Sequence, residues 1–153
     1  MSSSDADVQI RSATVADRDA VIALLHAQLS EHQIDLSDAA TARAIDGVLQ
    51  QPELGRLLIA TLEGKALGLA ALSFIWTYEY GGRAAWLDEL YVEPAHRGHG
   101  IGRKLVHAAY RAAVEGGAVA MDLEVEADHR RAERLYEREG FVRLQRARWS
   151  RRL

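Results

Sequence analysis

The chain has 153 residues, 48% of them apolar and 27% charged, which is the balance of one globular domain with its own core. No stretch approaches the ~20 consecutive apolar residues of a membrane-spanning helix. The first seven residues lack the basic and apolar regions of a secretion signal. The absence of cysteine excludes disulfides, a thiol nucleophile and Cys-ligated metals. We therefore expect a single domain over residues 1–153, cytoplasmic and without a membrane partner.

The net charge of −3 is the sum of two unequal halves. Residues 1–96 contain 6 Lys and Arg against 14 Asp and Glu, whereas residues 97–153 contain 13 against 8, so the halves carry −8 and +5. Such an asymmetry of charge indicates two kinds of binding partner, although clustering of like-charged side chains on solvated faces gives the same pattern. Of the 19 basic residues 17 are arginine, which suits bidentate contacts with phosphate.

The first part of the chain predicts a strand, two helices and three further strands. Residues 8–11 alternate as a half-buried strand does, and Thr14 is a candidate N-cap for the helix that follows. Ser37 is a candidate N-cap for a second helix. Gly81 and Gly82 fit a two-residue hairpin turn, because glycine tolerates the positive φ angles of such turns. The three expected strands are residues 57–62, 66–80 and 85–92.

The order of elements changes after Pro94. A glycine-rich loop leads into a helix with its apolar stripe from Ile101 to Ala112, and a strand follows at residues 119–125. A last helix ends at Gly140, and residues 141–153 predict one or two short strands. The order β-α-α-β-β-β-α-β-α-β predicts an α+β fold with a mixed sheet, antiparallel first and parallel in a later βαβ unit.

The segment from Arg97 to Arg103 is the most informative part of the sequence. Glycines stand at 98, 100 and 102 where a helix begins, so backbone N–H groups and the positive end of the helix converge. This pattern is typical of a phosphate or pyrophosphate site, with a plain structural turn as the alternative. The glycines are one residue too close for the dinucleotide fingerprint Gly-x-Gly-x-x-Gly, and no Walker A sequence is present.

At these residues the sequence resembles the GNAT superfamily of acetyl-CoA-dependent N-acetyltransferases. The family signature Arg/Gln-x-x-Gly-x-Gly/Ala stands here as Arg97-Gly98-His99-Gly100-Ile101-Gly102, and the downstream motif Ala-x-x-Leu-Tyr-x-x-x-Gly-Phe as residues 132–141. Within the superfamily the chain is most similar to diamine (spermidine/spermine-type) and related small-amine acetyltransferases. The resemblance covers residues 84–141. It implies a GNAT-like fold, in which a mixed sheet with a splayed parallel strand pair is flanked by about four helices.

The resemblance implies that acetyl-CoA is the acetyl donor. Backbone groups of Leu90 and Val92 would pair with the pantetheine arm as an added strand does, and amides after Arg97 would bind the pyrophosphate. Many relatives have Asn where this chain has His129, which leaves the role of that residue open. The residues expected to bind acetyl-CoA are Leu90, Tyr91, Val92, Arg97, Gly98, His99, Gly100, Ile101, Gly102, Arg103, His129 and Arg138.

The resemblance also implies three catalytic residues. Tyr136 matches the general acid that protonates the leaving thiolate, and a phenol with a pKa near ~10 is protonated at neutral pH. Asp88 matches the acid on the family's strand, where it would act as a base or hold an ammonium group. Neighbouring Glu89 is the other candidate. Because side chains alternate along a strand, we expect only one of the two to face the substrate, with Asp88 favoured.

Other aromatic and acidic residues are candidates for binding the amine acceptor. They are Glu31, His32, Tyr78, Tyr80 and Asp88. An aromatic and acidic mouth attracts a cationic amine through charge and cation–π contacts, although surface positions at a helix end and a hairpin explain the same residues. The six histidines form no ligand pattern, so we expect no metal.

These observations predict an enzyme that moves the acetyl group of acetyl-CoA directly to a primary amine of a small cationic acceptor. The alternatives are a protein N-terminal or lysine acetyltransferase and a non-catalytic acyl-CoA-binding module. We expect no nucleic-acid partner, because the basic residues surround the expected cofactor site and no recognition helix stands out. The family is often dimeric, which makes a homodimer the expected assembly.

Overall fold

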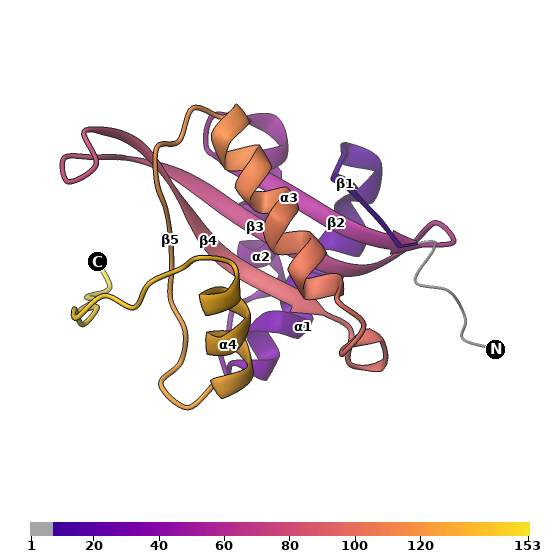
Figure 1. The fold of residues 1–153 in the computed structure, drawn as a ribbon. Helices are drawn as coiled ribbons and strands as arrows, with labels where there is room; N and C mark the ends of the chain where they lie inside the picture. Colours follow the sequence, from indigo (N-terminus) through magenta and orange to yellow (C-terminus); the bar gives the residue numbers. More distant parts are fainter. Residues whose placement is uncertain (1–7) are drawn as a thin grey trace.

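A mixed five-stranded sheet with helices on both faces forms the protein (Figure 1). The computed structural model describes residues 8–153, so residues 1–7, where we expect no secretion signal, lie outside the described part. Two short 3₁₀ helices, Val15–Asp17 and Pro94–His96, precede α1 and α3. The elements are β1 (Gln9–Ser12), α1 (Arg18–Glu31), α2 (Asp38–Gln50), β2 (Gly55–Leu62), β3 (Lys65–Thr77), β4 (Gly82–Val92), α3 (Ile101–Glu115), β5 (Met121–Leu123) and α4 (Arg130–Arg138).

The sheet has the strand order β1-β2-β3-β4-β5. Its first four strands pair antiparallel, and β4 pairs parallel with β5 after the crossover through α3. This architecture confirms the predicted fold class. The helix starts follow from local chemistry as well: the Ser37 hydroxyl accepts from the Ala40 N–H at 3.2 Å, and Thr14 and Asp17 form a capping box.

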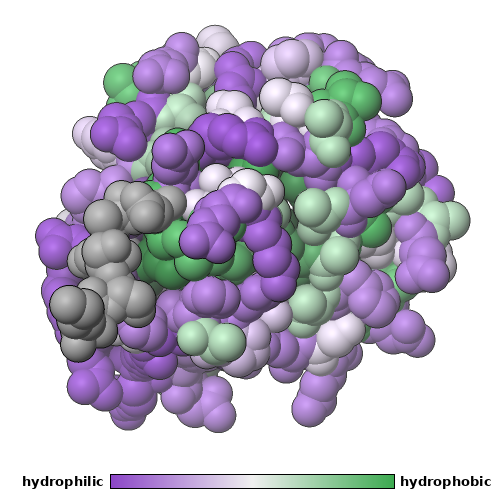
Figure 2. All heavy atoms as spheres, turned by 90° about the vertical axis from the view of Figure 1, so that its right-hand side faces the viewer, coloured by the Kyte–Doolittle hydropathy of each residue, from purple (hydrophilic) through white to green (hydrophobic). Residues whose placement is uncertain are grey.

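Alternation along the strands divides the core between the two faces of the sheet. Leu57 and Ile59 of β2 pack with α1 and α2, whereas Leu58 and Ala60 of the same strand pack against α3. α3 presents the apolar stripe expected from its sequence, with Leu105 fully buried. The sheet is therefore covered on both sides, and the face of the molecule drawn in Figure 2 is mostly hydrophilic.

The hairpin between β3 and β4 corrects one predicted turn. Thr77 pairs with Gly82, so the connection comprises the four residues 78–81 rather than a two-residue Gly81-Gly82 turn. Gly81 has a φ of +69°, but Gly82 belongs to β4. The turn differs because the pairing of β3 with β4 ends at Thr77 and Gly82, so β3 stops three residues before the strand end predicted at Tyr80.

The end of the chain corrects a second prediction. Residues 141–153 form no strand; they are largely exposed and extend away from α4. Arg146 pairs with Glu79 at 2.7 Å and Arg148 with Glu124 at 2.9 Å, so side-chain ion pairs hold this segment instead of a backbone ladder. The predicted strand at 119–125 is also shorter than expected, because only Met121–Leu123 pair with β4.

Candidate active site

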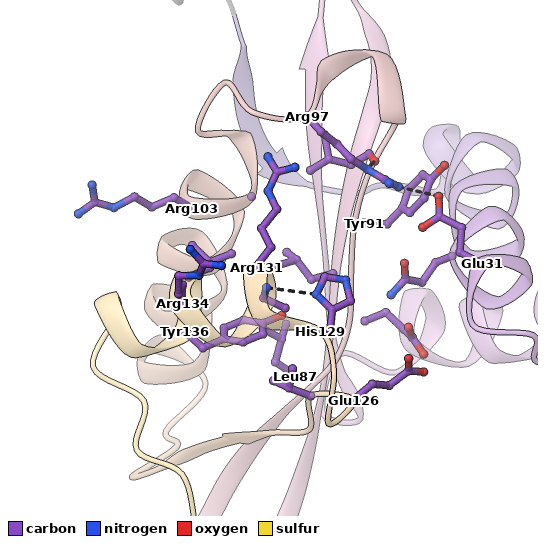
Figure 3. A pocket seen from close by; sticks show the side chains of 18 of the residues that line it. Glu31, Leu87, Tyr91, Arg97, Arg103, Glu126, His129, Arg131, Arg134 and Tyr136 are labelled. Carbon is purple, nitrogen blue, oxygen red and sulfur yellow. Dashed lines mark hydrogen bonds and ion pairs between the residues drawn. The ribbon is translucent and has the colours of Figure 1, made fainter.

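A cleft of about 1290 Å³ lies where β4 and β5 diverge (Figure 3). Pairing between them joins Ala85–Leu87 to Met121–Leu123 and then stops, while β4 continues to Val92. The cleft is lined by the end of β4, the glycine loop, the β5–α4 connection, α4 and the C-terminal turn of α1. Early separation of a parallel pair therefore leaves an edge of β4 open to a ligand.

The glycine loop brings the N-terminus of α3 to this cleft. Gly98 and Gly100 have φ values of +84° and +78°, which L side chains rarely adopt. Gly100 is the N-cap of α3 and supplies no side chain to bond the first N–H groups of the helix. No atom lies within 4 Å of the position that a Gly100 Cβ would occupy. An open helix end with unobstructed amides is suited to bind an anion.

Arginines surround the same end of the cleft. Arg103 donates to Glu139 at 2.7 Å, and His107 also contacts this carboxylate, whose side chain is 8% exposed. These contacts tie the end of α4 to α3. The spacing of three and four residues on α4 places three further arginines on one face. The arginines of the glycine loop, α3 and α4 that line the cleft are Arg97, Arg103, Arg131, Arg134 and Arg138.

Arg97 has a more specific position than the sequence predicts. Its Nε donates to the Val92 carbonyl at 2.7 Å, and its Nη2 pairs with Glu31 of α1 at 2.7 Å. Its guanidinium also lies over the Tyr91 ring, 5.5 Å from the centroid. The side chain thus connects the start of the glycine loop to β4 and α1. The Glu31 carboxylate partly neutralises the positive charge of Arg97.

A β-bulge places two adjacent carboxylates along the cleft. Ala71 pairs with Glu89 and Leu72 with Leu87, so Asp88 is the extra residue of β4. Both Asp88 and Glu89 line the cleft, because the bulge interrupts the alternation of side chains at this point. Which of the two carboxylates faces the substrate stays a prediction. Partial removal from water raises the pKa of each carboxyl above its usual value.

The two carboxylates have different partners. Asp88 accepts a short hydrogen bond from the Ser73 hydroxyl, and Arg148 lies close enough to attract its charge. Gln28 of α1 lines the cleft together with Glu89, and its amide lowers the pKa of the Glu89 carboxyl. Both contacts lower the pKa and oppose the effect of burial. Glu89 is also the carboxylate whose charge reaches Tyr136.

Tyr136 lines the cleft from α4. Its ring meets the Phe141 ring edge-on, with centroids 5.7 Å apart and an interplanar angle of 73°. Burial, with the nearby charge of Glu89, raises the pKa of Tyr136 to about 12. The phenol is therefore protonated at every pH at which the protein is expected to work, and it is available as a hydrogen-bond and proton donor.

His129 begins α4 and is its N-cap. Its Nδ1 accepts from the Ala132 N–H at 3.2 Å, so Nδ1 carries no proton and the ring proton resides on Nε2. This is the bond that an Asn side chain makes at an N-cap. His129 therefore makes the same contact with the backbone that the Asn of many relatives would make at this position.

We expect His129→Ala to lower the free energy of unfolding by about 0.5–2 kcal/mol, the usual effect of losing an N-cap. His129→Asn keeps a cap and should unfold at the denaturant midpoint of the unchanged protein. Urea unfolding followed by circular dichroism measures both. An alanine variant as stable as the asparagine variant would show that the cap contributes nothing.

One turn of α1 contacts three separate parts of the cleft. Gln28 lines the cleft together with Glu89 of β4, and Glu31 pairs with Arg97 of the glycine loop. His32 at the C-cap of the helix places Nδ1 2.9 Å from Glu126 in the β5–α4 connection. Positions 28, 31 and 32 lie on one helix face, because residues three and four apart are neighbours.

The comparisons with known proteins agree with this geometry. Residues 20–141 match the acetyltransferase (GNAT) family. The chain belongs to the GNAT acetyltransferase family. It is 31% identical over 134 residues to the uncharacterized N-acetyltransferase YhfO of Bacillus subtilis (strain 168), covering 88% of this chain and 89% of that protein. It is therefore an acetyl-CoA-dependent N-acetyltransferase.

Three other proteins are similar to this GNAT chain over most of its length. It is 29% identical over 136 residues to the aminoalkylphosphonate N-acetyltransferase of Salmonella typhimurium (strain LT2), covering 87% of this chain and 84% of that protein. An integron cassette protein from the mobile metagenome of Cole Harbour Salt Marsh has a TM-score of 0.84 at 26% identity, over 95% of this chain and 90% of that chain. The aminoglycoside N-acetyltransferase AAC(6')-Iy, solved with CoA, has the same fold, with a TM-score of 0.83 at 20% identity over 99% of both chains.

The cleft of this acetyltransferase brings together most of the residues singled out in the sequence. Tyr78, Tyr80 and His99 are not among its lining residues. The long β3–β4 hairpin carries Tyr78 out to 97% exposure, and the Tyr80 hydroxyl donates to Asp122 at 2.8 Å. The predicted residues that line the cleft are Glu31, His32, Asp88, Glu89, Leu90, Tyr91, Val92, Arg97, Gly98, Gly100, Ile101, Gly102, Arg103, His129, Tyr136 and Arg138.

The cleft of the acetyltransferase also contains residues that the sequence did not indicate. Gln28 stands within the apolar stripe of α1, and that break in the pattern was a usable signal. Arg131 and Arg134 carried none, because they lie off the apolar face of α4 that contains Leu135 and Tyr136, where arginines facing solvent are expected. Glu124, Glu126 and Arg148 are further charged lining residues that sequence reasoning missed.

Residues 8–153 of the acetyltransferase contain neither a cluster of metal ligands nor a membrane-spanning helix. No group of three or more His, Cys, Asp or Glu residues lies together as a metal site would require. No helix in this part of the chain is long and apolar enough to cross a membrane.

Proposed function

We propose that this enzyme transfers the acetyl group of acetyl-CoA directly to a primary amine of a small, cationic acceptor. The observation that carries the proposal is the division of charge within one cleft. Arginines and an open helix end lie at the α3–α4 side. Four carboxylates line the side toward β4 and the β5–α4 connection, and they are Asp88, Glu89, Glu124 and Glu126.

The basic side suits the phosphates of acetyl-CoA. Pyrophosphate would lie against the amides from Gly98 to Arg103, where the end of α3 and the nearby arginines favour negative charge. Backbone groups of Leu90 and Val92 on the open edge of β4 would bond the pantetheine amides. The Val92 carbonyl already accepts from Arg97, so this side chain would order the loop beside the ligand.

The acidic side suits the deprotonation of an amine. A primary amine that resembles lysine has a pKa near ~10.4, so removal of its proton at pH 7 costs about 4.6 kcal/mol. We assign the base to Glu89, because it is the carboxylate that interacts with both Gln28 and Tyr136. Asp88, fixed by Ser73, would hold the incoming ammonium group.

The transfer step then needs no acyl-enzyme, since the chain has no cysteine. The neutral amine attacks the thioester carbonyl and forms the new C–N bond. As the C–S bond breaks, Tyr136 donates its proton to the leaving thiolate. The attached nitrogen then loses its second proton to become an amide, and that proton restores the Tyr136 phenol directly or through water, while the proton taken earlier by Glu89 leaves to solvent. The raised pKa of Tyr136 keeps the phenol protonated before the C–S bond breaks, so the donor is in place when negative charge develops on sulfur.

A second class of acceptor is an amine that also carries an anionic group. Arg148 lines the cleft beside Glu124 at 2.9 Å and lies near Asp88. Its guanidinium would pair with such a group as arginine pairs with phosphate. The 29% identical relative named for aminoalkylphosphonates makes this class worth including in the test.

Thiol release from acetyl-CoA across a panel of amines tests the proposal. The panel contains a diamine, a triamine, an aminoalkylphosphonate, a peptide with a free N-terminal alanine and a lysine peptide with a blocked N-terminus. We expect the highest kcat/KM with the diamine or triamine, and lower values at higher salt because the cleft attracts charge. Preference for either peptide would replace the small acceptor with a protein. Binding of acetyl-CoA without thiol release from any amine would indicate a non-catalytic module.

We also propose a domain organisation, a cellular location and an oligomeric state for the enzyme. We expect the whole of residues 1–153 to act as one domain in the cytoplasm, in keeping with the absence of cysteine. We also expect a homodimer. Sedimentation equilibrium at several concentrations measures the oligomeric state.

A further inference from the structure

Arg148 brings a cation from the end of the chain to the acidic side of the cleft. It belongs to the extended segment after α4, drawn in yellow in Figure 1, and it lines the cleft together with Asp88 and Glu89. Its Nη1 donates to the Glu124 carboxylate at 2.9 Å. A guanidinium therefore lies among the carboxylates that we assign to the amine acceptor.

The contacts of this guanidinium are those with which proteins bind a cationic ligand. The Glu124 carboxylate accepts a charge-assisted hydrogen bond, and the guanidinium carbon lies over the Trp86 ring, 5.8 Å from the centroid. Asp88 is near enough that the positive charge opposes the rise in its pKa that burial causes. This part of the cleft therefore accommodates a cation between an acidic group and an aromatic face.

The register of the sheet explains why these groups lie together. Trp86 is directly opposite Ser73 of β3, and the Ser73 hydroxyl donates to Asp88. On its other side Trp86 pairs with Asp122 of β5, and the chain reaches Glu124 two residues later. Because cross-strand partners share one face of a sheet, the aromatic ring and the carboxylates gather where β4 and β5 separate.

We propose that Arg148 is a specificity-determining residue, whose guanidinium occupies the position of the second ammonium group of a diamine acceptor and is displaced when the diamine binds. This proposal rests on the proposed cationic acceptor. The ammonium group that reacts would lie beside Asp88 and Glu89, and the second would replace Arg148 at Glu124 and Trp86. A monoamine has no group that could displace Arg148.

Arg148 can leave this position without disturbing the fold. Its side chain is 65% exposed and that of Glu124 is 45% exposed, and an ion pair between exposed groups contributes little to stability. Residues 141–153 form no strand, so no backbone ladder resists the movement. Arg146 is bound separately to Glu79 at 2.7 Å, so the segment can stay attached while Arg148 moves away.

The surrounding charge favours competition with a cation over recruitment of an anion. Four carboxylates line this side of the cleft, and the groups paired with them are Arg148 and His32. Even with His32 protonated, the negative charges exceed the positive ones by two. A second ammonium group on the acceptor would be attracted by this excess, whereas an anionic group would be repelled.

The test measures KM for a diamine and for a monoamine of the same chain length with the Arg148→Met protein. Methionine keeps an unbranched side chain and removes the charge. The KM of the diamine should fall about two- to fivefold more than that of the monoamine, the range that follows from the strength of an exposed ion pair. The KM of acetyl-CoA should not change. Arg148→Lys returns the positive charge and should restore the KM of the diamine.

The matched control is Arg151→Met, which removes the same charge from the same segment. Arg151 does not line the cleft, so both KM values should stay as in the unchanged protein. Both substituted residues are exposed, so the variants should give the circular dichroism spectrum of the unchanged protein. An equal fall in the KM of the diamine in Arg151→Met would assign the effect to net charge and refute the proposal.

Two other outcomes overturn the proposal in different ways. If Arg148→Met leaves the ratio of the two KM values unchanged, or raises the KM of an aminoalkylphosphonate instead, Arg148 does not compete with the second ammonium group. If the unchanged protein acetylates neither the diamine nor the monoamine, the cationic acceptor itself is wrong, and the role of Arg148 falls with it. Thiol release from acetyl-CoA measures all of these rates.

Discussion

The Tyr136→Phe protein should lose about 10²–10⁴-fold in kcat while binding acetyl-CoA with unchanged affinity. The substitution removes one hydroxyl and keeps the ring, so the edge-on contact with Phe141 remains. Without the phenol, the thiolate must leave unprotonated or take its proton from water. Steady-state rates with a saturating amine and calorimetric titration with acetyl-CoA measure the two quantities.

The matched control for this change is Tyr110→Phe. Tyr110 lies on α3, is 60% exposed and does not line the cleft, so loss of its hydroxyl should leave kcat unchanged. Because the pKa of Tyr136 is raised to about 12, its titration should not contribute a basic limb to the rate profile below pH 9. An undiminished kcat in Tyr136→Phe would remove this residue from the mechanism.

Gly100→Leu should abolish measurable binding of acetyl-CoA while the protein remains folded. The new side chain would occupy the open space in front of the first amides of α3, where the pyrophosphate is proposed to lie. The φ of +78° adds strain of about 1–2 kcal/mol, which most folded proteins tolerate. Calorimetry with acetyl-CoA and a thermal melt distinguish lost binding from lost structure.

Gly64→Leu is a control with the same backbone cost. Gly64 has a φ of +79°, no atom lies within 4 Å of its Cβ position, and it stands in the β2–β3 turn away from the cleft. Its variant should be destabilised to a similar extent and bind acetyl-CoA normally. Normal binding by Gly100→Leu as well would disprove the phosphate site at the glycine loop.

The sequence was sufficient to predict the order and type of the regular elements up to α4. Periodicity identified the helices, because the faces that they bury repeat every three or four residues, as Leu105 and Ala112 do on α3. The residues at which the elements begin and end were less predictable. β5 ends at Leu123 because its partner diverges, and that divergence depends on how α3 and the sheet pack rather than on β5 itself.

The candidate site was predictable where the backbone carries the chemistry. Glycines at fixed spacing before a helix indicate an anion site regardless of what packs around them. The arrangement of the two carboxylates was not predictable, because the bulge at Asp88 arises from the register of β3 against β4. Arg131 and Arg134 were missed for a similar reason: they lie outside the apolar face of α4, and the sequence does not show that the polar side of this helix borders a cleft.

The contacts of α1 restrict how this enzyme can vary in length. Gln28, Glu31 and His32 reach three segments that stand between 61 and 94 positions further along the chain. One residue inserted between Leu24 and Gln28 would turn all three side chains by about 100° around the helix axis. A single insertion would therefore break every one of these links at once, whereas an insertion in the exposed β2–β3 turn would break none.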